Sequence, residues 1–393
     1  MSDDKINGQI PLGYYKIPDV KESKIPYNIE KLAKLLLDHR ASDLHIKSGV
    51  PPALRVSGDI VPVGKDILDE DDVAALLVPC LNDMARKKLE ISHEVDFAYE
   101  ASGVRFRVNM FLSKGKLCAA FRHLSSRIPT IDELGLPQIL KDVALKHNGL
   151  VLITGPAGSG KSTTLAAMID HINSNKRAHI VTLEEPIEFL HKNKFGYVTQ
   201  REVGDDTFTF FEGLKMALRQ DPNVILIGEM RDSETIMAAI LAAETGHLVL
   251  STLHTPNTIQ AIRRVVDALP ENQQAQFRAL LSNVLSCIIS QRLINKVDTK
   301  ERVAATEVLI PTSTVRSHIA DGNLSEIYEL MREGKHASMY TFTQSLVDLY
   351  DRGLISKEDA LYHADQPTEF KMDVEGHQTG TTFNKEETLI DWM

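Results

Sequence analysis

One segment of the chain has the residue types and spacing of a phosphate-binding loop. Its eight residues follow the pattern G-x-x-x-x-G-K-S: Gly155, Pro156, Ala157, Gly158, Ser159, Gly160, Lys161 and Ser162. The glycines would let backbone N–H groups surround a β-phosphate, Lys161 would reach the β- and γ-phosphates, and Ser162 would ligate Mg²⁺. An apolar run precedes the loop and a helical pattern starting at Thr163 follows it. This strand–loop–helix context predicts a site for ATP and Mg²⁺ rather than a glycine turn that only connects two elements.

Carboxylates follow two further apolar runs, where each predicted strand ends. Glu229 comes after residues 224–227, and Glu184 and Glu185 come at the end of residues 180–183. The carboxyl ends of parallel strands meet at the edge of the sheet that carries the phosphate loop, where such groups can polarise water or order Mg²⁺. We predict Glu229 as the base that activates water, and one of Glu184 and Glu185 as the group that positions water or metal. The alternative is that these carboxylates cap the following helices, and the sequence leaves open which of the pair acts.

Two histidines, His247 and His254, bracket the apolar run at residues 248–250 and its continuation. A histidine at a strand end commonly only completes local hydrogen bonds, but it can also sense a nearby phosphate. Spacing alone therefore allows both interpretations.

The elements that must position these residues alternate along the chain. Short apolar runs are separated by helical stretches and lie at residues 150–153, 180–183, 224–227 and 248–250. Such an alternation predicts a parallel sheet covered on both faces. We therefore expect a RecA-like P-loop ATPase domain of the α/β class over residues 148–372, whose part beyond about Leu309 is helical.

The preceding residues, 28–124, show a different pattern. Apolar residues recur at i, i+3, i+4 and i+7 and predict an amphipathic helix: Ile29, Leu32, Ala33 and Leu36. Strands are expected within residues 43–63, 104–112 and 117–124. A helix followed by antiparallel strands predicts a small, PAS-like α+β domain at the N-terminal end. The remaining segments are expected to be a flexible leader, a linker and a flexible tail, at residues 1–27, 125–147 and 373–393.

Composition limits the possible classes of protein. Acidic residues outnumber basic ones, 54 against 44, which gives a net charge of −10 and argues against a nucleic-acid partner. No apolar run approaches the ~20 residues that a transmembrane segment needs, and the start of the chain has no apolar signal core. We therefore expect a cytoplasmic protein. Three scattered cysteines offer neither a disulfide framework nor a four-cysteine zinc site: Cys80, Cys118 and Cys287.

Several motifs together resemble those of the secretion ATPase superfamily, and in particular its PilT-like branch of type IV pilus retraction motors. After the phosphate loop come TLEEPIEF, GEMRD and TGHLVLSTLHT, which are similar to the family's Asp box, Walker B and His box. Further matches are SDLH and RFRVNMF upstream, and REVGDDT, LRQDP and SQRLI downstream. The resemblance covers about residues 28–370.

This resemblance implies a homohexameric ring that hydrolyses ATP and docks, through a platform protein, at the inner-membrane base of a pilus machine. It implies that the nucleotide lies between the two domains, with Arg107 and Arg122 of the front domain reaching the γ-phosphate. From the residues alone, these arginines would be ordinary charges on a strand face. The resemblance also favours nucleotide-site roles for His247 and His254, the latter catalytic.

The chain departs from the family's pattern at three places. Glu185 stands where the family usually has aspartate, and Ala157 replaces the usual threonine of the loop. In the segment associated with retraction, only Arg316 and Ile319 persist. Two alternatives to a retraction motor therefore stay open: an accessory PilU-like ATPase, and an extension or secretion ATPase. The short leader and the lack of a four-cysteine site favour retraction, and we expect Val315 and Ile319 to be able to press on a partner.

Overall fold

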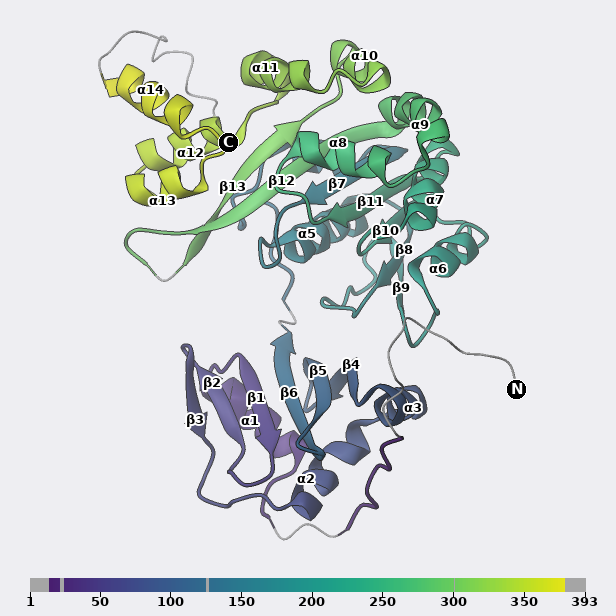
Figure 1. Cartoon of the computed structure of the whole chain (residues 1–393), viewed down its shortest axis with the longest axis vertical. Coiled ribbons are helices and arrows are strands. Elements are labelled where there is room, and N and C mark those ends of the chain that lie inside the picture. Colours follow the sequence, from purple (N-terminus) through teal and green to yellow (C-terminus); the bar gives the residue numbers. More distant parts are fainter. Residues whose placement is uncertain (1–13, 22–24, 125–126, 300, 379–393) are drawn as a thin grey trace. The chain divides into compact units, whose positions relative to one another are not determined.

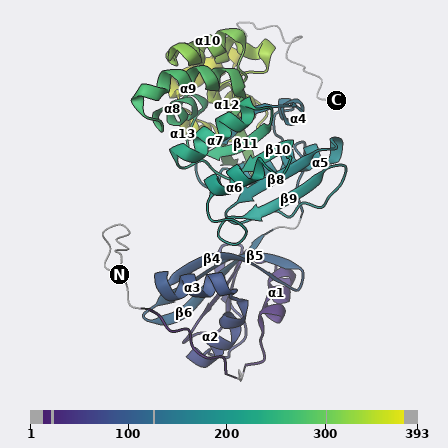
Figure 2. The same ribbon diagram turned by 90° about the vertical axis from the view of Figure 1, so that its right-hand side faces the viewer.

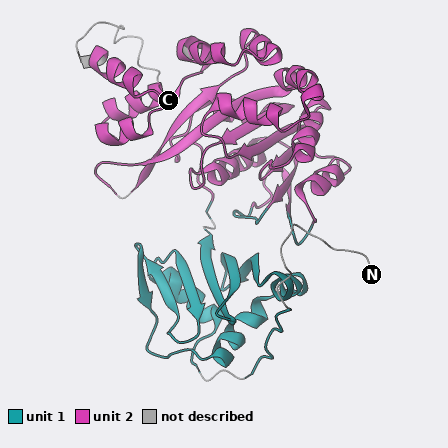
Figure 3. Cartoon of the chain, in the orientation of Figure 1, with its two compact units in different colours: residues 1–127, 185–190, 202–206 teal, residues 128–184, 191–201, 207–393 magenta. Residues whose placement is uncertain are grey.

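The computed structural model describes residues 14–21, 25–124, 127–299 and 301–378. The chain divides into two compact units, which Figure 3 shows in different colours. Unit 1 contains the residues up to Arg127 together with two short segments, 185–190 and 202–206, and unit 2 contains the rest. Unit 1 thus includes two segments that lie far along the chain from its main part.

The helices of unit 1 begin at polar caps. Helix α1 (Ile29–Asp38) starts where the Asn28 side chain accepts a hydrogen bond from the Lys31 N–H, and it buries the four apolar residues that the sequence predicts. Helix α2 (Glu70–Leu77) has a capping box between Asp69 and Asp72, and α3 (Asp83–Ser92) follows the short 3₁₀ helix Val78–Cys80. The sequence analysis did not predict α2 and α3.

A six-stranded sheet completes unit 1, in the order β3-β2-β1-β6-β5-β4 with antiparallel neighbours. Its strands are β1 (Asp43–Lys47), β2 (Ala53–Val56), β3 (Asp59–Pro62), β4 (Glu94–Ala101), β5 (Val104–Ser113) and β6 (Lys116–Leu124). Alternate residues of β5 are buried, from Val104 to Met110, and they share one apolar core with residues of all three helices. The predicted α+β arrangement is therefore confirmed, with β4 as an addition.

Part of the predicted leader packs onto unit 1. The Tyr15 N–H donates to the Glu90 carbonyl at 2.9 Å, Ile17 is buried in the core, and Lys21 pairs with Asp71 at 3.0 Å. Residues 1–13 and 22–24 of the leader lie outside the described residues.

Unit 2 is built on a seven-stranded sheet in the order β13-β12-β7-β11-β10-β8-β9 (Figure 1). Its strands are β7 (Gly149–Thr154), β8 (His179–Glu184), β9 (Tyr197–Glu202), β10 (Val224–Ile227), β11 (Leu248–Leu253), β12 (Leu285–Asn295) and β13 (Arg302–Leu309). The four predicted strands are present, and together with β12 they pair in parallel. The expected parallel sheet needs one correction, because β13 runs antiparallel to β12.

Helices cover this sheet and extend beyond it (Figure 2). They are α4 (Ile139–Ala144), α5 (Lys161–Asn175), α6 (Phe210–Ala217), α7 (Ser233–Glu244), α8 (Thr258–Asp267), α9 (Glu271–Val284), α10 (Ser313–Asp321), α11 (Ser325–Glu333), α12 (Phe342–Asp351), α13 (Lys357–His363) and α14 (Pro367–Gln378). Every residue of β7 and β11 is buried, as expected for strands covered on both faces. Helices α12 to α14 pack with Ile294 of β12 and Ala305 of β13 around a second, smaller core, which includes Phe342 and Phe370.

The predicted linker and tail contain packed residues. Ile131, Leu140 and Val143 are buried in the core of unit 2, so residues 128–147 belong to that unit. Residues 373–378 of the predicted tail form the end of α14, with Val374 buried, whereas residues 379–393 lie outside the described residues.

No helix in the described part of the chain combines the length and the apolar character needed to cross a membrane. The three cysteines are buried and free.

Candidate nucleotide-binding and catalytic site

The predicted phosphate loop connects the carboxyl end of β7 to the start of α5. Gly155 and Gly160 both have positive φ, +143° and +91°. A Cβ on Gly155 would lie 2.3 Å from the carbonyl oxygen of Gln291, so a larger residue does not fit there. The glycines are therefore required both by the backbone conformation and by the close approach of β12.

Gln291 of β12 links the phosphate loop and the start of α5 to the sheet through two hydrogen bonds. Its Nε2 donates to the carbonyl of Ser159 at 2.6 Å, and its Oε1 accepts from the Thr164 hydroxyl at 3.0 Å. Gln291 is buried, and a buried amide with both ends satisfied holds its partners in one geometry. The SQRLI motif contains Gln291, but its spacing in the sequence predicts no role for this residue. The only local signal is that Gln291 lies between two apolar pairs, Ile288-Ile289 and Leu293-Ile294.

Three polar side chains of the loop could contact a bound anion or its cation: Lys161, Ser159 and Ser162. Lys161 is buried, and its Nζ donates to the carbonyls of Gly155 and Pro156, each at 2.9 Å. The hydroxyl of Ser159 is buried and has no hydrogen-bond partner within the described residues. Ser162 lies exposed in the first turn of α5, where backbone N–H groups favour phosphate. Amide, ammonium and hydroxyl groups in this arrangement fit the phosphates of a nucleotide and a hard cation such as Mg²⁺.

Glu229 lies just beyond the end of β10 and meets His254, which follows β11. Because β10 and β11 pair in parallel, with Ile227 opposite Ser251, their carboxyl ends adjoin. The His254 Nε2 lies 3.4 Å from one carboxylate oxygen of Glu229, and Arg231 pairs with the other oxygen. The Glu229 side chain is only 12% exposed. The structure thus brings the predicted base and one predicted histidine together, and it adds Arg231, which the sequence analysis missed.

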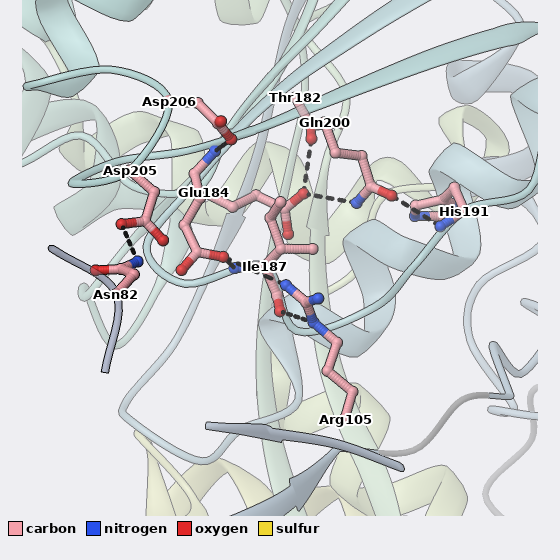
Figure 4. Close-up of polar contacts among 10 residues, drawn as sticks. Asn82, Arg105, Thr182, Glu184, Ile187, His191, Gln200, Asp205 and Asp206 are labelled. Atoms are coloured by element: carbon pink, nitrogen blue, oxygen red, sulfur yellow. Dashed lines mark hydrogen bonds and ion pairs between the residues drawn. The ribbon is translucent and has the colours of Figure 1, made fainter. Parts of the chain in front are cut away.

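The neighbouring carboxylates Glu184 and Glu185 differ in their surroundings. One oxygen of Glu184, at the end of β8, accepts hydrogen bonds from the Thr182 hydroxyl at 2.7 Å and from Gln200 Nε2 at 3.1 Å (Figure 4). Glu185 is exposed and is followed by a cis peptide bond to Pro186. Glu184 is therefore held in place by two side chains of unit 2, Thr182 and Gln200.

His247 lies at the amino end of β11, away from the phosphate loop. Strand β11 pairs in parallel with β7, with Leu248 opposite Gly149 and Leu253 opposite Thr154. Six residues of strand, ~20 Å, separate His247 from the carboxyl end of the sheet. Its Nδ1 lies 2.9 Å from the Ala242 carbonyl. The structure therefore does not bring His247 together with Lys161, Glu229 and His254 in this chain.

In unit 1, Arg107 and Arg122 lie side by side. They are direct register partners on β5 and β6, so they lie on the same face of the sheet. The Arg122 Nε donates to Asp43 at 3.0 Å, and the Arg107 Nε lies 3.7 Å from Asp96. Burial opposes ionisation of Asp43, but hydrogen bonds from Ser42 and Arg122 outweigh it and lower the pKa of this carboxyl. The pair thus presents two guanidinium groups on one face of unit 1.

Arg105, two residues before Arg107, holds together the two additional segments of unit 1. Its guanidinium donates to the Ile187 carbonyl at 3.2 Å and pairs with Glu202 at 3.3 Å (Figure 4). Glu202 also accepts from the Ile187 N–H at 3.1 Å. Burial raises the pKa of Glu202, and the Ile187 N–H and Arg105 partly offset this. Arg105 thereby fixes the residues that directly follow Glu184 and Glu185, a role that the sequence analysis did not assign.

This fold and site define a P-loop nucleotide-binding protein: a phosphate loop after a buried parallel strand, with a carboxylate and a histidine at the ends of adjacent strands. Residues 19–364 match the Type II/IV secretion system protein family, and the chain belongs to this family. It is an ATPase of that family.

Two curated relatives and one solved structure are similar to most of the chain. The type IV pilus retraction ATPase PilT of Pseudomonas aeruginosa is 45% identical over 344 residues, which cover 87% of this chain and 100% of that protein. The type IV pilus ATPase PilU of the same organism is 42% identical over 344 residues, covering 87% of this chain and 90% of that protein. A crystal structure of the pilus retraction motor PilT with bound ADP superposes with a TM-score of 0.83 at 44% identity, covering 88% of this chain and 99% of that one.

Proposed function

We propose that this chain is the subunit of a hexameric motor that hydrolyses ATP to retract a type IV pilus. The observation that carries the proposal is the contact between Glu229 and His254, 3.4 Å apart at the strand ends that adjoin an intact phosphate loop. An accessory subunit that only binds ATP has no need of this pair. Similarity over the whole length of PilT supports the biological role.

In this mechanism the phosphate loop binds the β- and γ-phosphates, and Lys161 leaves its carbonyl partners to contact them. Ser162 would hold Mg²⁺, which supplies charge stabilisation to the phosphates. Glu229 accepts the proton of the attacking water, while Arg231 and His254 orient its carboxylate. Glu184 or Glu185 positions the water or the metal. His247 does not enter this scheme.

Arg107 and Arg122 are proposed to reach the γ-phosphate when the ring assembles. Two adjacent guanidinium groups can stabilise the charge that develops during phosphoryl transfer. Their present partners, Asp96 and Asp43, would keep them extended on one face of the sheet. For unit 1 we propose a PAS-like fold, supported by its antiparallel sheet and its single apolar core. We further propose that the ring works in the cytoplasm, docked on a platform protein at the inner membrane.

The accessory role remains a second candidate, because the similarity to PilU nearly equals the similarity to PilT. Helix α10 contains the segment that the family resemblance associates with retraction. Val315 and Ile319 are fully buried, so the expectation that they press on a partner is wrong in this structure. Arg316 donates to the carbonyls of Ser282, Asn283 and Leu285 at the end of α9. The retained residues of this segment thus serve packing within unit 2.

Deletion of the gene tests the direction of movement. If the motor retracts pili, a strain that lacks it keeps as many surface pili as before, or more, and loses twitching, because assembly continues without withdrawal. Pili are counted by electron microscopy, with a complemented strain as the control. A strain without pili would contradict retraction and indicate an extension motor, and unchanged pili with unchanged twitching would indicate the accessory role.

Ring formation is tested separately in solution. With Mg²⁺ and a non-hydrolysable ATP analogue, multi-angle light scattering is expected to give the mass of six subunits, because the γ-phosphate would draw Arg107 and Arg122 toward the loop. The Lys161→Ala variant is the matched control, since it weakens the contact with the nucleotide. A strict monomer at micromolar concentration would exclude the ring.

A further inference from the structure

Arg292, on β12, connects two parts of unit 2 that lie far apart in the sequence. Its guanidinium donates to the Pro256 carbonyl at 3.2 Å, to the His363 carbonyl, and to the Asp365 carboxylate at 2.6 Å. The guanidinium carbon also lies 4.2 Å from the centre of the Phe342 ring. Only 13% of the Arg292 side chain is exposed. This charged group is thus almost enclosed by its own partners.

The contacts of Arg292 use features that are specific to arginine. A planar fork of donors reaches two carbonyls and a carboxylate at once, while its face stacks on an aromatic ring. Lysine provides a single ammonium and cannot reproduce both contacts. The side chain is therefore a rigid connection rather than a general positive charge.

The connected parts are the segment after His254 and the C-terminal helices. Pro256 stands two residues after His254, whereas His363 ends α13, Asp365 precedes α14, and Phe342 begins α12. Arg292 directly follows Gln291, which anchors the phosphate loop. Three of these residues, Pro256, Arg292 and His363, also line one pocket of about 610 Å³, together with the phosphate-loop segment 156–159 and His254.

A second, independent connection joins the same two parts. Glu307 of β13 is buried, and one of its oxygens accepts from the Thr258 N–H at 2.8 Å and from the Thr258 hydroxyl at 2.7 Å. Its other oxygen accepts from the Phe342 N–H at 3.4 Å. The segment from His254 to Thr258 is therefore tied to α12 through Glu307 and to α13 and α14 through Arg292.

We propose that Arg292 is a positioning residue that couples His254 to the helical region α12–α14. Through Arg292, a change at His254 on nucleotide binding alters the helices, and a load on the helices alters the position of His254 against Glu229. Such coupling acts in both directions, because linkage between two sites is reciprocal. The inference rests on the proposed role of His254 at the nucleotide.

A double-mutant cycle with Arg292→Ala and His254→Ala, made in the full chain, tests this coupling. In the wild-type background, Arg292→Ala is expected to lower kcat about tenfold with little change in KM. The reason is that the misplaced His254 would stabilise the transition state less, whereas substrate binding would be unaffected. In the His254→Ala background the same change is expected to cost less than about twofold. Arg292→Lys should not restore kcat, because lysine lacks the fork.

Arg332→Ala is the matched control, since the Arg332 guanidinium pairs with Glu369 of α14 at 3.6 Å and with Glu329 of α11 at 3.9 Å, and neither partner belongs to the segment after His254. Its kcat is expected to stay at the wild-type value. An equal loss from Arg292→Ala in both backgrounds would overturn the proposal, because it would indicate a purely structural role.

Hydrogen exchange gives a readout that does not depend on turnover. In the wild type, a non-hydrolysable ATP analogue is expected to change exchange in α13 and α14, and Arg292→Ala should abolish this change. If His254→Ala keeps full kcat, the proposed role of His254 fails, while the exchange experiment still decides the coupling. A nucleotide response that persists in Arg292→Ala overturns it. Should that variant not fold, Asp365→Asn removes only the charged partner, and the same loss of response is expected from it.

Discussion

Replacing Lys161 with alanine is expected to abolish ATP hydrolysis. Lys161 is buried in the phosphate loop, where its ammonium is held by two loop carbonyls next to the start of α5. Its removal takes away the cation that contacts the β- and γ-phosphates, so both nucleotide binding and charge stabilisation in the transition state are lost. Loss of one such group costs on the order of 10²–10³-fold in kcat, and lost binding adds to this. Phosphate release measures the effect.

Lys176→Ala is the matched control for this variant. Lys176 caps the other end of α5, and its Nζ donates to the Lys146 carbonyl at 2.8 Å. A lysine is thus removed from the same helix without a change at the phosphate loop, and turnover should remain close to the wild-type rate. Thermal unfolding of both variants shows whether each is folded. A folded Lys161→Ala variant with wild-type turnover would exclude the loop as the hydrolytic site.

The Glu229→Gln variant is expected to bind ATP but to hydrolyse it very slowly. Glutamine keeps the size of the side chain and can still contact Arg231, but it cannot accept a proton from water. Positioned general bases contribute about 10²–10⁴-fold, so a loss of this order in kcat is expected. A fluorescent ATP analogue should show affinity equal to that of the wild type or tighter, because one negative charge near the phosphates has been removed.

Glu234→Gln is the control for this substitution, since Glu234 lies exposed in the first turn of α7, five residues further along. Its kcat should not change. Parallel measurements on Glu184→Gln and Glu185→Gln decide which of these two carboxylates acts, and the hydrogen bonds to Glu184 favour that residue. Undiminished kcat in Glu229→Gln would require a different base.

Features that depend on a local pattern of residues could be predicted from the sequence. The phosphate loop is a contiguous motif, and its flanking strand and helix are where the pattern requires them. Each of the four apolar runs became a buried strand, as expected for short, mostly apolar segments of a sheet that is covered on both faces. Helix α1 likewise buries the residues that its helical periodicity selects.

Strand β12 was missed for a local reason. It follows α9 directly: the helix ends at Val284 and the strand begins at Leu285, and neither a glycine nor a proline marks this boundary. Without β12, no role could be predicted for Gln291 and Arg292, whose partners lie more than 30 residues away in the chain. Their roles follow from tertiary contacts that no spacing rule contains.

The positions of the two histidines depend on how the strands pair in the folded chain. His247 and His254 flank the same strand and looked equivalent in sequence. In the folded chain β11 runs parallel to β7, so its carboxyl end adjoins the end of β10 and places His254 3.4 Å from Glu229. His247 is left at the opposite edge of the sheet, beside the Ala242 carbonyl. Sequence supplies the chemical groups, but the direction and order of the strands determine which of them meet.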